Sequence, residues 1–471
     1  MLVHEHILKA EIPYVSPFSL FALFHDQTGA LLFHSALAHD VFGRYSYIAM
    51  EPFQTLVAKN GRIALDSAPL HGNPFLVLKT LLADYKQSTL VDLPPFQGGI
   101  AGAFSYDLYP YIESFSTDQS DNMQFPDLSV GFYDVVISFD HQALRAWIVS
   151  TGWPEKTIDK RISRAKQRLD HIRDFIANPP IINVDETALN LCKTDNIHSH
   201  FNEKTYADAV TRVIEHIKAG DVFEANISQC FTTQNPHLLP FDLYKRLMRQ
   251  NPAPFAAYLN LGEFIVVSAS PERFLKLKDG FVETRPIKGT RRRDPDPVVD
   301  RALADELVNS EKDRAENIMI VDLMRNDLSK VCREDSVMVG QLCQLETYPS
   351  VHHLVSVVTG ELKPRFGAID LLMATFPGGS ITGAPKVRAM QIIASIEPTK
   401  RGIYCGSIGF IGFDGNLDLS IAIRTYTIKQ DMITFQAGGA VVIDSNPQDE
   451  YQETLTKSHA LHHALTHLDE S

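Results

Sequence analysis

Several features that would assign this chain to other classes of protein are absent from its sequence. It has five cysteines in 471 residues, an odd number with no CxxC pair, so a disulfide framework is not expected. No apolar run approaches the length of a transmembrane helix, and residues 1–6 show no basic region ahead of an apolar run, so no signal peptide is evident. We therefore expect a cytoplasmic protein with free thiols and no membrane partner.

Positive charge is also scarce. The chain has 44 Lys and Arg against 57 Asp and Glu, a net charge of −13, which disfavours nucleic acid and anionic membranes as partners. The same balance means that an anionic small ligand needs a local cation, supplied by a side chain or a metal ion.

The motif of a phosphate-binding loop and that of a glutaminase are missing as well. The loop 377–386 is rich in glycine and ends in a lysine, but it lacks the GK[ST] of a phosphate loop, and Pro385 has no N–H to offer a phosphate. The GxCxG motif of a glutaminase is not found, because Cys405 is followed by Gly406 but preceded by Tyr404. We therefore expect neither a phosphate-binding loop nor glutaminase activity from this chain alone.

The composition is that of a globular protein with a substantial core, 44% hydrophobic and 21% charged. Periodicity is lost between Asn178 and Ser199, where two consecutive prolines open a linker. The sequence is therefore divided into an N-terminal region of mainly short strands, a linker and a C-terminal region, with the bounds 1–177, 178–199 and 200–471.

The stretch from Glu283 to Thr290, which reads ETRPIKGT, is the most informative. Lys288 follows the β-forming Ile287 and precedes a glycine, a setting typical of a strand end or a tight turn. Burial there favours the neutral amine, which acts as a nucleophile or a base. Glu272 lies upstream, after a separate apolar strand. The alternative is an ordinary surface lysine.

Two predicted helices carry carboxylates on faces that continue as apolar. Asp313 and Glu316 are three residues apart and share a face with Ile320, and a second helix, beginning near Asp449, places Glu450, Glu453 and Lys457 on one face. A solvated charged face is the usual interpretation of such pairs, but the apolar continuation indicates a shared cleft. Carboxylates without cysteine or clustered histidine suit Mg²⁺.

Arg424 lies within the apolar run Ser420–Tyr426, which predicts an arginine inside a strand. A buried guanidinium needs an anionic partner because it does not lose its charge. That partner is either a protein carboxylate or a carboxylate of a ligand. The segment Ala437–Ala440 offers unhindered backbone N–H groups that suit a carboxylate.

The motifs SPERF, TRPIKGT, KDRAENIMIVDLMRNDL and FPGGSITGAPKVRAM resemble those of the chorismate-utilising enzymes. This family includes component I of anthranilate synthase, component I of aminodeoxychorismate synthase, and the isochorismate and salicylate synthases. The resemblance extends from about Leu31 to Leu465. The PIKGT sequence, with lysine where anthranilate synthases are expected to have alanine, favours the aminodeoxychorismate synthases.

The resemblance implies an α+β fold in which two β-sheets pack face to face with helices outside. It also implies that residues 1–177 and 200–471 interleave in these sheets. The implied substrate is chorismate, whose ring carboxylate would bind Mg²⁺ held by Glu316, Glu450 and Glu453, with Asp313 nearby. Further substrate-binding positions implied by the motifs are Ser380, Tyr404, Arg424, Gly438, Gly439, Ala440 and Lys457.

The implied reaction makes 4-amino-4-deoxychorismate for p-aminobenzoate and folate synthesis. Lys288 would attack ring carbon two while Glu272 acts as general acid, and His353 matches a further catalytic position. Ammonia, delivered by a separate glutamine amidotransferase subunit, would then displace the lysine. Two alternatives remain open: an anthranilate synthase component I, and a non-catalytic relative that binds tryptophan or a partner and regulates it.

Two further features follow from the resemblance. A candidate tryptophan site is formed by His34, Ser35, Arg44, Tyr45, Pro254 and Phe255, for which ordinary sheet and loop packing is an equal alternative. The strand Val222–Phe231 departs from the family, which is expected to have glutamine in place of Glu224 and arginine in place of Cys230.

Overall fold

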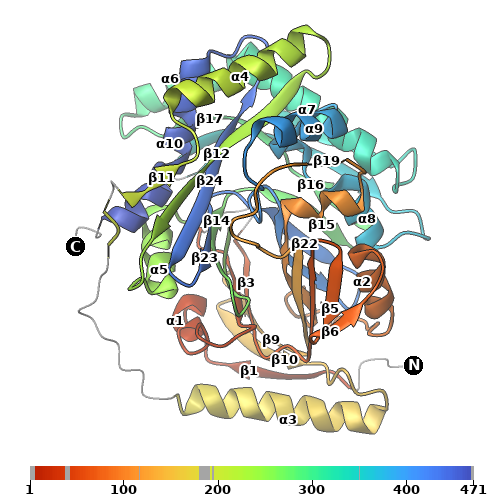
Figure 1. Cartoon of the computed structure of the whole chain (residues 1–471). Helices are drawn as coiled ribbons and strands as arrows, with labels where there is room; N and C mark the ends of the chain where they lie inside the picture. The colour runs from red at the N-terminus through yellow and green to blue at the C-terminus, as the bar shows by residue number, and fades with distance from the viewer. Residues whose placement is uncertain are drawn as a thin grey trace.

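Two antiparallel sheets form the centre of the protein (Figure 1). The structure is a computed structural model that describes residues 6–37, 43–115, 117–179, 191–193, 196–348 and 351–467. Within those residues each sheet has 12 strands, and helices cover the outer faces. This is the α+β architecture predicted from the motifs.

Sheet A holds the strands that begin and end the chain. Its order is β1-β10-β9-β3-β2-β13-β14-β23-β24-β12-β11, and β20 pairs with β12 at one end. The bounds are β1 (Leu8–Ile12), β2 (Leu31–His34), β3 (Tyr45–Ala49), β9 (Val135–Asp140), β10 (Arg145–Ser150), β11 (His198–Ser199), β12 (Glu224–Gln234), β13 (Phe255–Asn260), β14 (Ile265–Ser270), β20 (Gly383–Ala384), β23 (Thr425–Lys429) and β24 (Met432–Val441).

Sheet B runs in the order β17-β19-β16-β15-β22-β21-β7-β8-β4-β5-β6, and β18 pairs with β19. The bounds are β4 (Gln54–Lys59), β5 (Arg62–Leu65), β6 (Ala68–Leu70), β7 (Gly99–Phe104), β8 (Leu128–Tyr133), β15 (Arg273–Lys278), β16 (Phe281–Thr284), β17 (Ile287–Arg292), β18 (Met338–Thr347), β19 (Val351–Glu361), β21 (Ser407–Gly412) and β22 (Leu417–Ile421). Both sheets therefore combine strands from before and after the predicted linker.

An apolar layer lies between the two sheets. It contains Leu31 and Tyr47 from sheet A and Ala103 and Phe410 from sheet B, and Phe410 stacks on Phe96 with ring centroids 4.4 Å apart. Because side chains alternate across a strand, the opposite faces of both sheets also need cover.

Helices provide that cover and form larger clusters with the outer faces of the sheets. Helices α4, α6, α7 and α9 gather at one end of the molecule, whereas α3 lies along the opposite end beside β1 and β10 (Figure 1). The bounds are α1 (Pro17–Phe21), α2 (Pro74–Ala83), α3 (Ile158–Ala177), α4 (Glu203–Lys218), α5 (Pro240–Gln250), α6 (Pro297–Asn309), α7 (Glu311–Ser329), α8 (Ala368–Thr375), α9 (Lys386–Ile396) and α10 (Pro447–Thr466), with 3₁₀ turns η1 (Tyr106–Tyr111) and η3 (Gly379–Ile381).

Helix starts follow local capping chemistry. The Asn202 side chain accepts a hydrogen bond from the Thr205 N–H at the start of α4, and the Asn446 side chain accepts from two N–H groups at the start of α10. This cap fixes the residue at which α10 begins. The start of the helix in turn determines that the side chains of Glu450 and Glu453 face β24. The two predicted helices that carry carboxylates are confirmed as α7 and α10.

The prediction of one strand through Arg424 is wrong. The chain breaks between β22 and β23, and Arg424 lies in the break with a φ of 51°. The strand ends because the pleat cannot continue through a left-handed backbone conformation. Most of the predicted linker, residues 180–190 and 194–195, lies outside the described residues, and its remainder includes β11.

None of the helices in the described ranges combines the length and apolar composition needed to cross a bilayer.

The ion pair of Glu397 and Arg401 is buried between sheet A and α9, with both side chains 1% exposed. Glu397→Ala leaves a buried guanidinium without its counterion, and we expect it to lower the free energy of unfolding by about 3–5 kcal/mol. Denaturant unfolding followed by fluorescence measures this change. Glu11→Ala, which breaks an exposed pair with Arg145, is the control and should leave the midpoint nearly unchanged. Equal effects of the two changes would contradict the prediction.

Candidate active site

Lys288 is the second residue of β17, at the edge of sheet B. Its Nζ donates a hydrogen bond of 2.7 Å to Oε1 of Glu224, the first residue of β12 in sheet A. The Lys288 side chain is 10% exposed and the Glu224 side chain 0%. Lys288 is therefore buried, as the sequence predicts, but it is also paired.

The strand reaches this position through a bulge. Register shifts between Ile287 and Thr290 where β17 pairs with β19, and Gly289 has a φ of +84°. A Cβ at Gly289 would lie 2.9 Å from the Cβ of Asp313 on α7. Only glycine combines that φ with so close an approach to the helix.

The prediction that burial leaves Lys288 neutral is wrong for this arrangement. Burial lowers the pKa of Lys288, but the carboxylates of Glu224, Glu316 and Glu272 outweigh it and raise the pKa above its usual value. Lys288 is therefore an ammonium group in the absence of substrate, and it must give up a proton before it can act as a nucleophile.

Glu272 lies between β14 and β15 and is buried. Burial raises the pKa of Glu272 to about 7, although the Ser380 hydroxyl, which donates a hydrogen bond of 2.8 Å to Oε1, and the nearby Lys288 oppose the shift. A carboxyl group that is partly protonated near neutral pH suits a general acid. The structure thus brings Lys288, Glu272 and Ser380 together.

His353 lies on β19, across from β17. Its Nδ1 is 2.8 Å from the Thr290 hydroxyl oxygen, and burial together with the positive charge of Arg424 lowers the pKa of His353 to about 4. The imidazole is therefore neutral at physiological pH, and it takes part in hydrogen bonding without adding charge to the site.

The two helices predicted to bring carboxylates together do so in part. Burial raises the pKa of Glu316 on α7 to about 7 and raises that of Glu450 on α10. A Cβ on Gly439 of β24 would lie 3.0 Å from Oε2 of Glu450 and 3.3 Å from Oε1 of Glu453. These two carboxylates therefore lie directly over β24.

Two of the predicted metal ligands have cationic partners within the protein. Asp313 accepts from Arg291 at 3.3 Å, and Glu453 is 2.6 Å from the ammonium group of Lys457. In the part of the chain that the structure describes, no group of three or more His, Cys, Asp or Glu side chains converges closely enough to hold a metal ion. The four predicted ligands are thus not assembled into one site.

The individual carboxylates nevertheless fit Mg²⁺. Oε2 of Glu450 is buried and has no hydrogen-bond partner in the described part of the chain, while its Oε1 accepts from Ser445 at 2.7 Å. A buried oxygen without a donor is unfavourable unless a cation or a proton compensates for it. Hard carboxylate oxygens are the ligands that Mg²⁺ prefers.

Arg424 lies in the break before β23, and burial lowers its pKa. Its Nη1 donates a hydrogen bond of 3.2 Å to the Asn251 side-chain oxygen, which is an amide. Within the described residues no protein carboxylate forms an ion pair with it. Of the two predicted partners, a ligand carboxylate fits this arrangement better, because a buried guanidinium needs a negative charge.

The glycines of β24 lie beyond the end of β23, its neighbour on one side. β23 pairs with β24 only as far as Tyr426 and Phe435, whereas β12 continues along Gly438, Gly439 and Ala440. On the β23 side, the backbone of these residues therefore has no strand partner within the described ranges. Lys457 donates to the Gly438 carbonyl at 3.1 Å, so this lysine contacts both β24 and Glu453.

Tyr404 is buried at one wall of a cavity of about 300 Å³. The cavity is also lined by Cys230, the position where the resemblance predicts arginine, so a smaller side chain leaves space there. Burial raises the pKa of the Cys230 thiol to about 12, which keeps it protonated.

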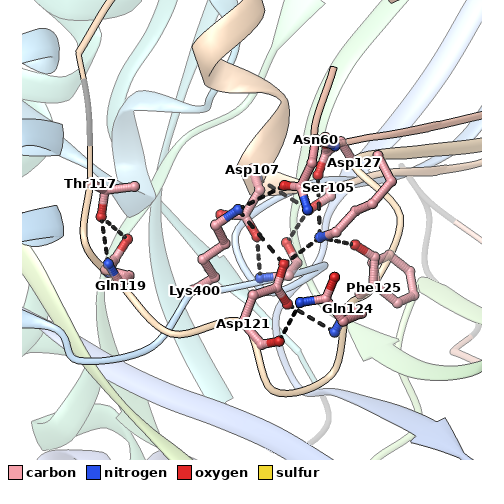
Figure 2. A network of polar contacts seen from close by, with 12 residues as sticks. Asn60, Ser105, Asp107, Thr117, Gln119, Asp121, Gln124, Phe125, Asp127 and Lys400 are labelled. Carbon is pink, nitrogen blue, oxygen red and sulfur yellow. Dashed lines mark hydrogen bonds and ion pairs between the residues drawn. The ribbon is translucent and has the colours of Figure 1, made fainter. Parts of the chain in front are cut away.

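A polar network fixes the loop that carries Tyr404 (Figure 2). Lys59 donates to Asp121 at 2.5 Å, and Lys400 lies 3.7 Å from the same carboxylate. The Gly402 N–H donates to Asp107 at 3.0 Å. These contacts hold the segment 399–404 against an N-terminal loop.

The residues of the candidate tryptophan site lie close together. Some of their contacts are with one another, and one is with Asp140. The Ser35 hydroxyl donates to the carbonyl oxygens of Tyr45 at 2.7 Å and Pro254 at 3.4 Å. Arg44 forms an ion pair with Asp140 at 2.8 Å. Sheet and loop packing accounts for these contacts, and tryptophan binding stays a prediction.

Two other members of this set have partners of their own. The Nδ1 atom of His34 is 3.1 Å from the Tyr244 hydroxyl, and the guanidinium of Arg273 lies 5.1 Å from the ring centroid of Phe255.

Comparison with known proteins identifies relatives along nearly the whole chain. The model of the family described as chorismate binding enzyme matches residues 33–463. Aminodeoxychorismate synthase component 1 of Bacillus subtilis is 37% identical over 90% of this chain and 89% of its own length. Anthranilate synthase component 1 of Acetivibrio thermocellus is 35% identical over 96% and 92%.

A solved structure has the same fold. Anthranilate synthase component I from Streptococcus pneumoniae TIGR4 superimposes with a TM-score of 0.80 at 31% identity, covering 89% of this chain and 92% of that one.

Glu316 provides a test of these electrostatics. Its pKa is about 7 in the folded protein and about 4.3 in an unfolded chain. Between these pH values Glu316 has lost its proton in the unfolded chain but keeps it in the folded protein. The ionisable side chain therefore destabilises the folded protein at high pH. We expect Glu316→Gln to raise the free energy of unfolding by about 1–3 kcal/mol at a pH of about 8, and by less toward a pH of about 4.

Denaturant titrations without divalent cations at several pH values measure the gain. Glu334→Gln, at an exposed position, is the control and should show none. A gain that does not depend on pH would disprove the burial effect at Glu316.

Proposed function

Because this chain belongs to the chorismate binding enzymes, we propose that it is component I of an aminodeoxychorismate synthase. It uses chorismate, and in this proposal it converts chorismate and ammonia to 4-amino-4-deoxychorismate. The observation that carries the proposal is a buried lysine, Lys288, close enough to interact electrostatically with Glu272, whose pKa burial raises to about 7. A nucleophilic amine beside a general acid is what a displacement of a hydroxyl requires.

In the proposed reaction, the neutral amine of Lys288 attacks ring carbon two of chorismate. Glu272 donates a proton to the hydroxyl at carbon four, which leaves as water. Ammonia then adds at carbon four and displaces the lysine from carbon two. Two successive displacements retain the configuration at carbon four, and the net change replaces a hydroxyl with an amine.

Other residues would bind the two carboxylates of the substrate. Arg424 and the backbone of Gly438 and Gly439 beyond the end of β23 suit the enolpyruvyl carboxylate, because the Arg424 side chain has an amide and no carboxylate as its partner among the described residues. Mg²⁺, held by Glu316, Glu450 and Glu453, would neutralise the ring carboxylate when bound. The nitrogen would come from a separate glutamine amidotransferase, as a component I would require.

Anthranilate synthase component I is the second candidate, because relatives of both kinds match the chain with similar identity. Lys288 favours the first proposal, since a side-chain amine can occupy carbon two before ammonia arrives. A purely regulatory role is the third, and the presence of Lys288 and Glu272 disfavours it. Incubation with chorismate, Mg²⁺ and ammonium, followed by identification of the aminated product, distinguishes all three.

The variant Lys288→Ala tests the lysine directly. We expect it to lose formation of 4-amino-4-deoxychorismate by more than about a hundredfold, because nothing then occupies carbon two. A small amount of product aminated at carbon two is expected instead. Lys276→Ala, on strand β15 of the same sheet, is the control and should react normally. Undiminished formation of the original product by Lys288→Ala would rule out the nucleophile.

Metal dependence is the second test. The carboxylates of α7 and α10 would repel a dicarboxylate unless a cation lies between them. Activity should therefore disappear in excess chelator and return with Mg²⁺, and Glu450→Gln should weaken the response to Mg²⁺ about tenfold or more. Full activity in chelator would show that these carboxylates have a structural role only.

A further inference from the structure

Glu224 is the residue that contacts the amine of Lys288, and the proposed reaction has given it no task. Its Oε1 accepts the 2.7 Å hydrogen bond from Nζ, and its side chain is fully buried. The position is well fixed: Glu224 pairs with Ala384 of β20, and a Cβ on Gly383 would lie 2.1 Å from the Glu224 carbonyl oxygen. The carboxylate is thus held against the amine by the backbone of two strands.

Lys288 has to lose a proton before it can bond to carbon. Carboxylates hold its pKa above the usual value, so the ammonium form predominates without substrate. Within the described residues, the structure records Glu224 as the one hydrogen-bond acceptor of Nζ. A proton leaving Nζ along this bond reaches Glu224 without passing through solvent.

The other oxygen of Glu224 strengthens the argument. Oε2 is buried and has no hydrogen-bond partner among the described residues. If the proton of Lys288 left for solvent, Glu224 would remain as a buried carboxylate beside a neutral amine. Such an isolated charge is strongly unfavourable. Transfer of the proton within the pair leaves two neutral groups and avoids that cost.

We propose that Glu224 is the general base that accepts a proton from Lys288 Nζ as this atom bonds to ring carbon two. The proposal rests on the proposed function, since it needs Lys288 as nucleophile. The Nζ–H bond breaks and an O–H bond forms on Glu224, while the lone pair freed on nitrogen forms the bond to carbon. When ammonia displaces the lysine, Glu224 returns the proton to the departing amine.

The neighbouring acids have other tasks. Glu272, Glu316 and Glu453 also act on the charge of Lys288. Glu272 accepts from Ser380 and supplies the proton of the leaving hydroxyl. Glu453 is 2.6 Å from Lys457. Glu316 is a candidate Mg²⁺ ligand, and its carboxylate is 4.0 Å from Lys312.

The test measures formation of the lysine adduct, which is separate from product turnover. Wild-type protein, Glu224→Gln and Glu224→Asp are mixed with chorismate and Mg²⁺ without ammonium. Intact-protein mass then follows the gain of chorismate less one water over time. Lys288→Ala is the negative control, and Glu283→Gln, a carboxylate 3.2 Å from Arg273, is the matched control.

Glutamine keeps the size of the side chain but accepts no proton. We expect Glu224→Gln to form the adduct about a hundredfold more slowly near neutral pH. Because its Lys288 must lose the proton to solvent, the ratio of variant to wild-type rate should rise about tenfold for each pH unit. The reaction rate also falls at high pH, when Glu272 loses its proton. This fall is common to both proteins and cancels in the ratio of their rates.

Glu224→Asp retains a carboxylate and should keep a ratio to wild type that does not change with pH, although the rate is lower. It also tests the proposal should the glutamine variant fail to fold, since a ratio that rises with pH in this variant would overturn it. A Glu224→Gln rate equal to wild type at every pH would also overturn it. Absence of the adduct in wild-type protein would instead overturn the proposed function.

Discussion

A buried ion pair joins the two sheets where the site lies. Lys288 belongs to sheet B and Glu224 to sheet A, and their side chains meet at 2.7 Å. An apolar layer also joins the sheets, and apolar packing is non-directional. The ion pair is directional, and so it relates β17 to β12 and brings the amine to one defined place.

The chemistry of the site depends on charged groups whose burial is energetically unfavourable. The chain has a net charge of −13, and its site adds further carboxylates to a region that must receive an anion. Burial compensates for this by raising the pKa of Glu272 and Glu316 to about 7, so both groups carry less negative charge than an exposed glutamate. Arg424 and Lys457 supply positive charge from two other elements.

Function is also visible in departures from regular structure. Arg424 lies at a break between strands, Gly289 occupies a bulge, and the glycines of β24 extend past the end of β23. Each of these irregularities interrupts the regular pairing of a strand. Regular strands would have satisfied those backbone groups with each other and left nothing for a ligand.

The sequence by itself determined the family, the α+β class and the two helices that carry the candidate carboxylates, because these follow from dense local motifs and periodicity. It also predicted a strand end or a tight turn at Lys288, with a surface lysine as the alternative, and placed Asp313 and Glu316 on one helix face. These are local properties, set by residues a few positions apart in the chain.

Only the tertiary structure decided which groups meet. Glu224 stood out in the sequence as a departure from the family, and nothing within the chain near it pointed to Lys288, which is 64 residues away. The charge of Lys288, the pairing of Asp313 with Arg291 and the amide partner of Arg424 were likewise beyond sequence analysis. Burial and Coulomb interactions depend on distances in space, and these are set only when both sheets have assembled.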